Sequence, residues 1–147
     1  MSILRSLRYQ HDEASRMMLR LINLIDAHRA DDDAFPIALL LARWVSLLRS
    51  HLAMEDEWLY PAVVALGSLR AATIARVFEA DMGNLAQRLE AFDRRWSSSA
   101  VIAGDFDRFR DEAFTLFADF DRRIEREDRT LYPIAEASGV VVMPKAA

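Results

Sequence analysis

His51 and Glu55 have the residue types and the spacing of metal ligands. Residues four apart on an α-helix lie one turn apart on the same face, so this imidazole and this carboxylate can point at one spot. Such a pair suits either a metal ion or acid–base chemistry. The pair alone is not specific, because charged helices produce this spacing by chance and a buried His is often only hydrogen-bonded.

A second copy of the segment around this pair lies 72 residues further along the chain. The matching groups are Glu55-Asp56 with Glu127-Asp128, Leu59-Tyr60-Pro61 with Leu131-Tyr132-Pro133, and Gly67 with Gly139. The main mismatch places Arg123 opposite His51. An ungapped match over this span arises by chance far less often than either motif alone. We therefore interpret the two segments as facing halves of one site.

Apolar stripes of helical period predict four long helices that would carry these residues. We expect them over about residues 3–29, 36–66, 69–96 and 105–138. Long amphipathic helices with short connections favour an all-α, up-down-up-down four-helix bundle, whose interior can hold a site built from facing side chains. We assign residues 1–139 to this single domain and residues 140–147 to a C-terminal tail.

The first helix adds a third candidate ligand. His11 lies between Leu7 and Ala14 in the apolar stripe and is directed toward the core, whereas His28 falls at the far end beside a loop. We interpret His28 as a structural or surface residue, so only His11 is a ligand candidate.

Three further residues should shape the helices. Pro61 falls inside a helical pattern, and we expect it to kink the helix just beyond Glu55. Gly83 interrupts the third helix and either admits a neighbouring backbone or is simply tolerated. Asp105 is the expected N-cap of the fourth helix.

The composition excludes several classes of function. The chain has 147 residues with only 4 Gly and 4 Pro, which is typical of a compact helical domain. A net charge of −4 without a separate basic cluster argues against nucleic acid as a partner. No cysteine is present, so a metal would have to bind His and carboxylate. The longest apolar run contains an Arg and we judge it too short to span a bilayer. We therefore expect a soluble, cytoplasmic protein without a membrane contact.

These motifs resemble the hemerythrin-like family of HHE cation-binding domains. The resemblance covers most of the chain and rests on His11-Asp12, on residues 51–61 and on residues 123–133, which match the family's HxxxEExxLFP-like segments. It implies a metal site inside a four-helix bundle, with His11 and His51 as terminal ligands of one iron. It also implies that Glu55 and Glu127 are the carboxylates that bridge a pair of irons.

The ligands of the family's second iron are missing from this sequence. The resemblance places them near Phe78 and Met82 on the third helix and at Arg123 on the fourth, and none of these residues is a His. Asp81 is close enough to be a substitute but falls at the edge of the stripe. The site can therefore hold at most one metal ion, with iron as the main expectation and manganese or zinc as alternatives. A di-iron oxygen carrier is not expected.

Arg123 also supports a metal-free interpretation, which stays open beside the first. Its guanidinium would enter the half of the site that lacks the ligands of the second iron, which we call the vacated half. There it would bind Glu55 and Glu127 in bidentate fashion, replacing a cation. With a metal, the family implies a sensor, store or small redox site for iron, oxygen, nitric oxide or peroxide. Without one, the domain would be a structural or interaction module.

The residues around the site and on the surface complete these expectations. No nucleophile with its base and no phosphate-binding loop is recognisable, so an enzymatic role ranks third. We expect Asp56, Glu57 and Asp128 to be solvated or to orient ligands. We also expect Trp58 and Trp96 to be exposed, which leaves a homodimer open.

Overall fold

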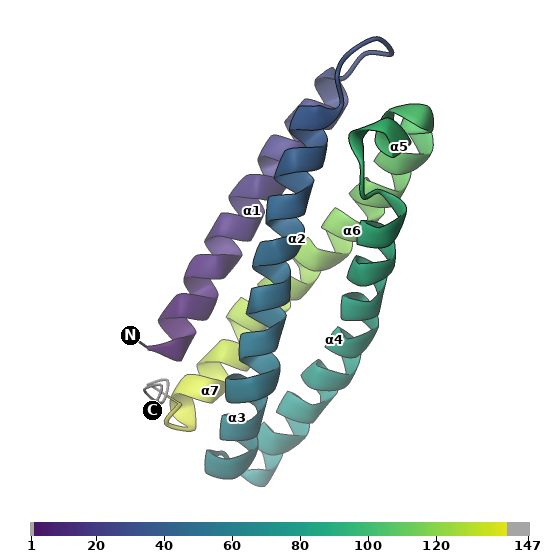
Figure 1. Cartoon of the computed structure of the whole chain (residues 1–147). Helices are drawn as coiled ribbons and strands as arrows, with labels where there is room; N and C mark the ends of the chain where they lie inside the picture. Colours follow the sequence, from purple (N-terminus) through teal and green to yellow (C-terminus); the bar gives the residue numbers. More distant parts are fainter. Residues whose placement is uncertain (1, 141–147) are drawn as a thin grey trace, which may run out of the picture.

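The computed structural model describes residues 2–140 and shows a bundle of four long helical segments (Figure 1). Consecutive segments run in alternate directions, which confirms the predicted all-α, up-down-up-down architecture. The first segment is α1 (Ile3–Ala27) and the third is α4 (Leu69–Arg95). The second joins α2 (Phe35–Met54), η1 (Glu55–Leu59) and α3 (Tyr60–Leu66), and the fourth joins α6 (Phe106–Arg126), η2 (Glu127–Leu131) and α7 (Tyr132–Ala137).

Serine hydroxyls mark the beginnings of three helices. Ser2, Ser68 and Ser98 each accept a hydrogen bond from a backbone N–H three residues later, which satisfies one of the free donors of the first turn. Ser98 caps a short additional helix, α5 (Ser99–Gly104), inside the connection where the sequence predicted only a break. Asp105 precedes α6 as expected, but its side chain makes no capping hydrogen bond.

Both Pro-containing segments contain a π-helical turn, and in the first of them the turn lies where the sequence predicted a kink. In η1 the N–H of Tyr60 donates to the carbonyl of Glu55, and in η2 the N–H of Tyr132 donates to the carbonyl of Glu127. Each turn ends two residues before the proline. A proline lacks an N–H and its ring clashes with the carbonyl four residues earlier, so the wider turn accommodates it without ending the helix.

The hydrophobic core is divided into two clusters along the bundle. One contains Trp44, Leu48, Phe117 and Phe120, and the other contains residues near the prolines and the N-terminus of α1. On the first, second and fourth segments the boundary between the clusters falls where the sequence predicted a ligand, and on α4 it falls between Phe78 and Met82, where the predicted ligands are missing. The candidate site therefore lies in the middle of the bundle with an apolar layer on either side.

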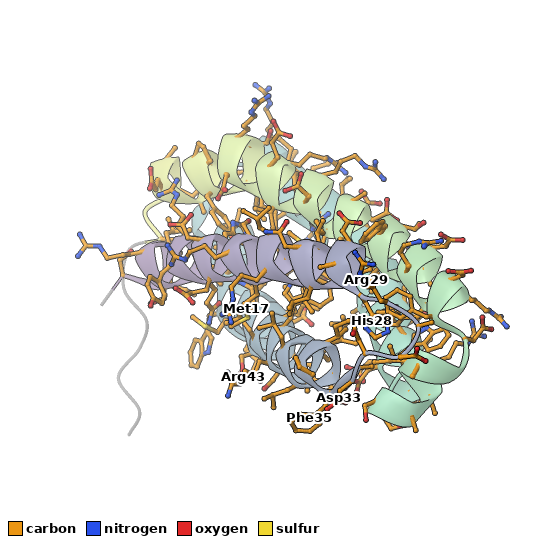
Figure 2. All side chains as sticks on the ribbon, turned by 90° about the horizontal axis from the view of Figure 1, so that it is seen from above. Met17, His28, Arg29, Asp33, Phe35 and Arg43 are labelled. Carbon is orange, nitrogen blue, oxygen red and sulfur yellow. The ribbon has the colours of Figure 1, made fainter. Side chains whose placement is uncertain are left out.

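The end of the bundle at the α1–α2 loop holds the remaining histidine. His28 is the C-cap of α1, and its ring stacks on Phe106 with the centroids 4.1 Å apart. Figure 2 shows His28 beside the loop, near Arg29. His11 is about 25 Å away along the same helix, at 1.5 Å per residue. His28 is thus remote from the other two histidines, as expected.

Trp96 differs from its expected position. Its side chain is only 4% exposed, packs edge-on against Phe109 and donates from Nε1 to Glu112, so it belongs to the core. Trp58 is 38% exposed, as predicted. The buried ring of Trp96 cannot form part of a dimer surface.

The second helical segment is long enough to meet a criterion that its longest apolar run alone was judged to fail. The continuous helix Phe35–Leu66 is long and apolar enough to cross a membrane by length and composition alone. Of its most apolar window, 44% is buried in the bundle, and the inner face carries His51 and Glu55. The core helix of a bundle meets the same criterion of length and hydropathy, so this finding alone is weak evidence for a membrane span.

Candidate metal centre

Five buried polar side chains meet between the two apolar clusters. They come from five elements: His11 from α1, His51 from α2, Glu55 from η1, Arg123 from α6 and Glu127 from η2. Each is at most 5% exposed. The fold thus brings all four predicted ligands and the mismatched arginine into one enclosed place.

The ligand atoms lie within a few ångströms of one another. His11 Nε2 is 3.1 Å from His51 Nε2 and 3.2 Å from Glu127 Oε1, and His51 Nε2 is 3.1 Å from Glu55 Oε1. His51 Nε2 is 3.8 Å from Glu127 Oε1. One atom from each of His11, His51 and Glu127 lies within 4.8 Å of the others, as in a metal site.

The outer nitrogens of both imidazoles are held by acceptors. His11 Nδ1 donates to Asp128 Oδ1 at 2.9 Å, and His51 Nδ1 donates to Gln10 Oε1 at 2.8 Å. The Gln10 amide nitrogen in turn donates to Met54 Sδ at 3.3 Å, which fixes the orientation of the amide. A neutral ring held in this way presents the lone pair of Nε2 to the centre, as in metal-binding histidines.

The centre is rich in acceptors and poor in donors. Both oxygens of Glu55 and Oε2 of Glu127 are buried without a hydrogen-bond partner among the described residues. His51 Nε2 and Glu55 Oε1 are close and yet make no hydrogen bond. Buried acceptors of this kind carry a desolvation cost unless a cation or protons satisfy them.

The geometry and the chemistry of the donors fit one metal ion. Two ligand atoms that are each about 2.1 Å from an ion and at right angles to one another lie about 3.0 Å apart. The separations of 3.1 and 3.2 Å among the ligand atoms are close to this value. Two imidazoles and two carboxylates suit Fe(II), Mn(II) or Zn(II).

Burial and proximity shift the pKa values of the two carboxyl groups in opposite directions. Burial raises the pKa of Glu55 well above its ordinary value, and the nearby Glu127 carboxylate raises it further. Burial alone would also raise the pKa of Glu127, but contacts with the Glu55 carboxyl group and the His11 and His51 rings hold that pKa below its ordinary value. These opposite shifts favour a single negative charge on the pair, which Arg123 can balance.

Arg123 does not clamp both carboxylates, which corrects the sequence-based interpretation. Its Nη2 donates to the carbonyl oxygen of Phe78 at 2.6 Å and to the hydroxyl of Tyr60 at 3.1 Å. Its Nε lies 3.6 Å from Glu127 Oε2 as an ion pair and makes no hydrogen bond. The carbonyl and the hydroxyl take the N–H donors that a bidentate contact would need.

The other residues of the vacated half are apolar or turned outward. Phe78 and Met82 are each 4% exposed and belong to the core, and the Phe78 ring lies under the Arg123 guanidinium at 4.6 Å. Asp81 is exposed and 3.8 Å from Arg126, so it does not reach the site. Among the residues that the structure describes, this half offers a second ion no further imidazole or carboxylate.

Sequence reasoning missed one hydroxyl group at the centre. Tyr132 Oη lies 3.1 Å from His11 Nε2 and 3.4 Å from His51 Nε2, and its ring stacks on that of His11. Burial, together with the charges of Glu55 and Glu127, raises the pKa of Tyr132 well above its ordinary value. The signal was present in the sequence, because both copies read Leu-Tyr-Pro where the family motif has Leu-Phe-Pro.

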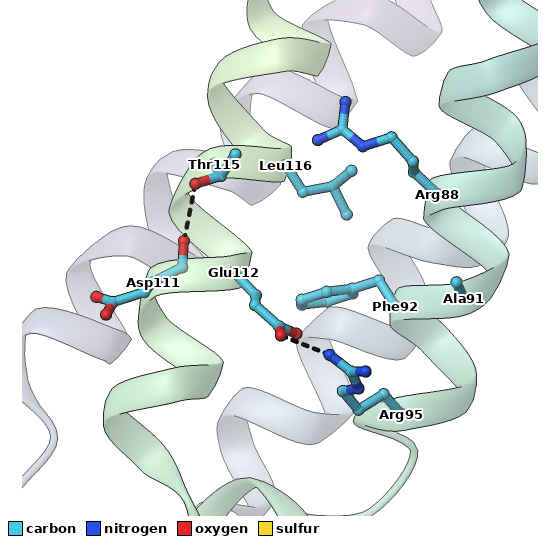
Figure 3. A pocket seen from close by; sticks show the side chains of 8 residues that line it. All are labelled: Arg88, Ala91, Phe92, Arg95, Asp111, Glu112, Thr115 and Leu116. Atoms are coloured by element: carbon cyan, nitrogen blue, oxygen red, sulfur yellow. Dashed lines mark hydrogen bonds and ion pairs between the residues drawn. The ribbon is translucent and has the colours of Figure 1, made fainter.

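A surface groove between α4 and α6 is separate from this centre. Its lining includes Arg88, Phe92 and Arg95 from α4 and Glu112 and Leu116 from α6 (Figure 3). Arg95 is paired with Glu112, and Arg88 is paired with Asp119. The groove shares no lining residue with the His and Glu cluster.

The fold and the buried cluster together define an all-α bundle protein with a candidate His/Glu metal centre in its core. Comparison with protein families agrees: the chain belongs to the hemerythrin HHE cation binding domain family, whose sequence profile matches residues 2–135. Comparisons with curated proteins and with solved structures gave no match. Family membership extends across all four helical segments and includes every candidate ligand.

Proposed function

We propose that this chain binds one non-haem metal ion in the bundle core, with iron as the main candidate and manganese or zinc as alternatives. His11, His51 and Glu127 are its ligands, and Glu55 is the fourth. The observation that supports this most strongly is the pair of Nε2 atoms, 3.1 Å apart, in rings whose Nδ1 atoms are already bound to acceptors. A cation between these lone pairs satisfies both rings at once.

The chain's own residues prepare the site for an ion. Asp128 and Gln10 orient the imidazoles, and the apolar clusters on both sides keep water away. Glu55 holds a proton that it gives up when a metal arrives, so binding releases a proton. When bound, iron would supply redox chemistry and an affinity for small diatomic or peroxide ligands.

The vacated half limits the site to a single ion. Phe78 offers no lone pair, Met82 offers only a soft thioether that suits Cu(I) rather than the metals proposed here, and the Arg123 guanidinium already supplies a positive charge beside Glu127. A second divalent cation there would be repelled by Arg123. We infer that the domain is not a di-iron oxygen carrier. It would act instead as a sensor or store for iron, oxygen, nitric oxide or peroxide.

One observation favours a second candidate function. Arg123 and Glu127 form an ion pair in which both side chains are at most 5% exposed, so the core already has one counter-charge without a metal. Together with the proton on Glu55, this pair can close a neutral polar network. The domain would then be a metal-free structural or interaction module.

Metal analysis distinguishes the two functions. Protein purified without chelators, or loaded with Fe(II) without oxygen, should hold about one equivalent of metal per chain. The double variant His11→Ala/His51→Ala should lose it, whereas His28→Ala should keep it because His28 lies at the far end of the bundle. Equal metal in the wild type and the double variant would overturn the proposed site. A wild type that takes up no metal would favour the metal-free module.

A further inference from the structure

The π-helical turn η2 brings a tyrosine onto the same face as a ligand. Glu127 and Tyr132 are five residues apart, and on an α-helix they would point in directions about 140° apart. The bond from the Tyr132 N–H to the Glu127 carbonyl closes a wider turn instead. Both side chains consequently reach the centre of the bundle.

The Tyr132 hydroxyl has the spacing of a ligand atom. It lies 3.1 Å from His11 Nε2, which is the distance between the two histidine Nε2 atoms themselves. Its distance to His51 Nε2 is 3.4 Å. The side chain is fully buried, and the Tyr132 ring is fixed by stacking on His11, with the centroids 5.1 Å apart and the planes at 14°.

A metal ion at the histidines would remove the present partners of this hydroxyl. Each Nε2 has one lone pair, which either accepts from the Tyr132 O–H or binds a metal. Once the ion takes both lone pairs, a buried hydroxyl is left without its acceptors, which is unfavourable. An ion between the two Nε2 atoms would lie within reach of the phenol oxygen and could replace them as its partner.

We propose that Tyr132 is an additional oxygen ligand of the metal ion and that it makes the site favour ferric over ferrous iron. This inference rests on the proposed metal-binding function. When Fe(III) binds, an Fe–O bond forms, the phenolic O–H bond breaks and the proton passes to the solvent, with no change in oxidation state. An anionic phenolate oxygen stabilises the more highly charged ion more strongly.

Tyr60 provides a matched control in the other half of the repeat. It follows η1 as Tyr132 follows η2, and it is equally buried. Its hydroxyl accepts a hydrogen bond from Arg123 Nη2 at 3.1 Å and, within residues 2–140, makes no hydrogen bond to either histidine. Removing this hydroxyl changes a similar buried ring while leaving the proposed ligand in place.

Visible absorption of the iron-loaded protein tests the proposal. The wild type, Tyr132→Phe and Tyr60→Phe are loaded with Fe(III), and bound iron is measured alongside the spectrum. The wild type and Tyr60→Phe should show a phenolate-to-iron charge-transfer band in the visible range, and Tyr132→Phe should lose it while still binding iron. The iron reduction potential should be higher in Tyr132→Phe than in the other two proteins.

The possible failures are distinguishable. A wild type with bound iron and no such band, or a Tyr132→Phe variant that keeps the band, overturns the Tyr132 proposal and leaves the metal site standing. A wild type that binds no iron overturns both. Should Tyr132→Phe fail to fold or to bind iron, resonance Raman spectroscopy of the wild type decides: tyrosinate vibrations enhanced in its band support the proposal, if Tyr60→Phe retains them. Their absence rejects it.

Discussion

Asp128 Oδ1 accepts a hydrogen bond from His11 Nδ1 at 2.9 Å, so the residue directly after one ligand orients another. The same relationship recurs on α1, where Gln10 precedes His11 and accepts from His51. The first and fourth segments therefore each hold an imidazole of another ligand-bearing segment. The site's geometry depends on the packing of the whole bundle rather than on any single helix.

Asp128→Ala should weaken metal binding by about 10- to 100-fold, because outer partners of this kind fix the ring orientation of a ligand and raise its basicity. Asp56 is the equivalent residue of the first copy, is exposed and is not bonded to an imidazole, so Asp56→Ala is the control. Competition titration with a metal chelator measures both. Equal affinities in the two variants would mean that Asp128 does not support His11.

Arg123→Ala should destabilise the metal-free protein by more than about 2 kcal/mol, because the buried Glu127 carboxylate loses its counter-charge. Urea unfolding near neutral pH measures this loss. The neighbouring Arg122 side chain is 69% exposed, so Arg122→Ala should change stability little. If the two variants are equally stable, Arg123 does not neutralise the core.

Glu55 should make the metal-free protein less stable as the pH rises. Its pKa is about 4.5 in the unfolded chain and well above that in the fold, chiefly because of burial, so the folded state binds the extra proton between these two values. The free energy of unfolding therefore falls as the pH rises between the two pKa values. Below the pKa of the unfolded chain, Glu55 is protonated in both states and causes no further change with pH. Glu55→Gln should remove this loss. Urea unfolding in the presence of a chelator, from pH 5 to 9, compares the two proteins.

Metal affinity should show the opposite pH dependence. The ion must displace the proton from Glu55, so binding becomes tighter as the pH rises through the same window. Titrations with Zn(II), which has no redox chemistry, measure this at several pH values. An affinity that does not change with pH would indicate that Glu55 is not a ligand.

The sequence predicted the bundle and the meeting of the ligands, because both depend on periodicity. His11 interrupts an apolar stripe between Leu7 and Ala14, and that position alone directs it inward. The repeat then placed Glu55 and Glu127 on facing segments. Periodicity and repeats of this kind can be read directly from the order of residue types along the chain.

The contacts of individual atoms could not be predicted in the same way. The sequence assigned Arg123 to Glu55 and Glu127, whereas its contacts with the Phe78 carbonyl and the Tyr60 hydroxyl depend on how α3 and α4 pack against α6. The π-helical turns shift residues by a fraction of a turn, which stripe counting does not resolve. The role of Tyr132 was missed for this reason, since it falls off the α-helical face of Glu127.

Gly67 should be intolerant of substitution, in contrast to Gly83. A Cβ atom at Gly67 would lie 2.6 Å from the carbonyl oxygen of Val63 and 2.9 Å from Ser138 Oγ, and the first of these is backbone that cannot move aside. Gly67→Ala should therefore destabilise the protein by roughly 1–3 kcal/mol, the usual cost of overpacking.

A Cβ at Gly83 would meet nothing within 4 Å, and this residue lies inside α4. Gly83→Ala should accordingly stabilise the protein by up to about 1 kcal/mol, because Ala is the better helix former. Thermal unfolding of the two variants should move the midpoint in opposite directions, and a shift of the same sign in both would contradict the close packing of the α3–α4 turn against the end of α7.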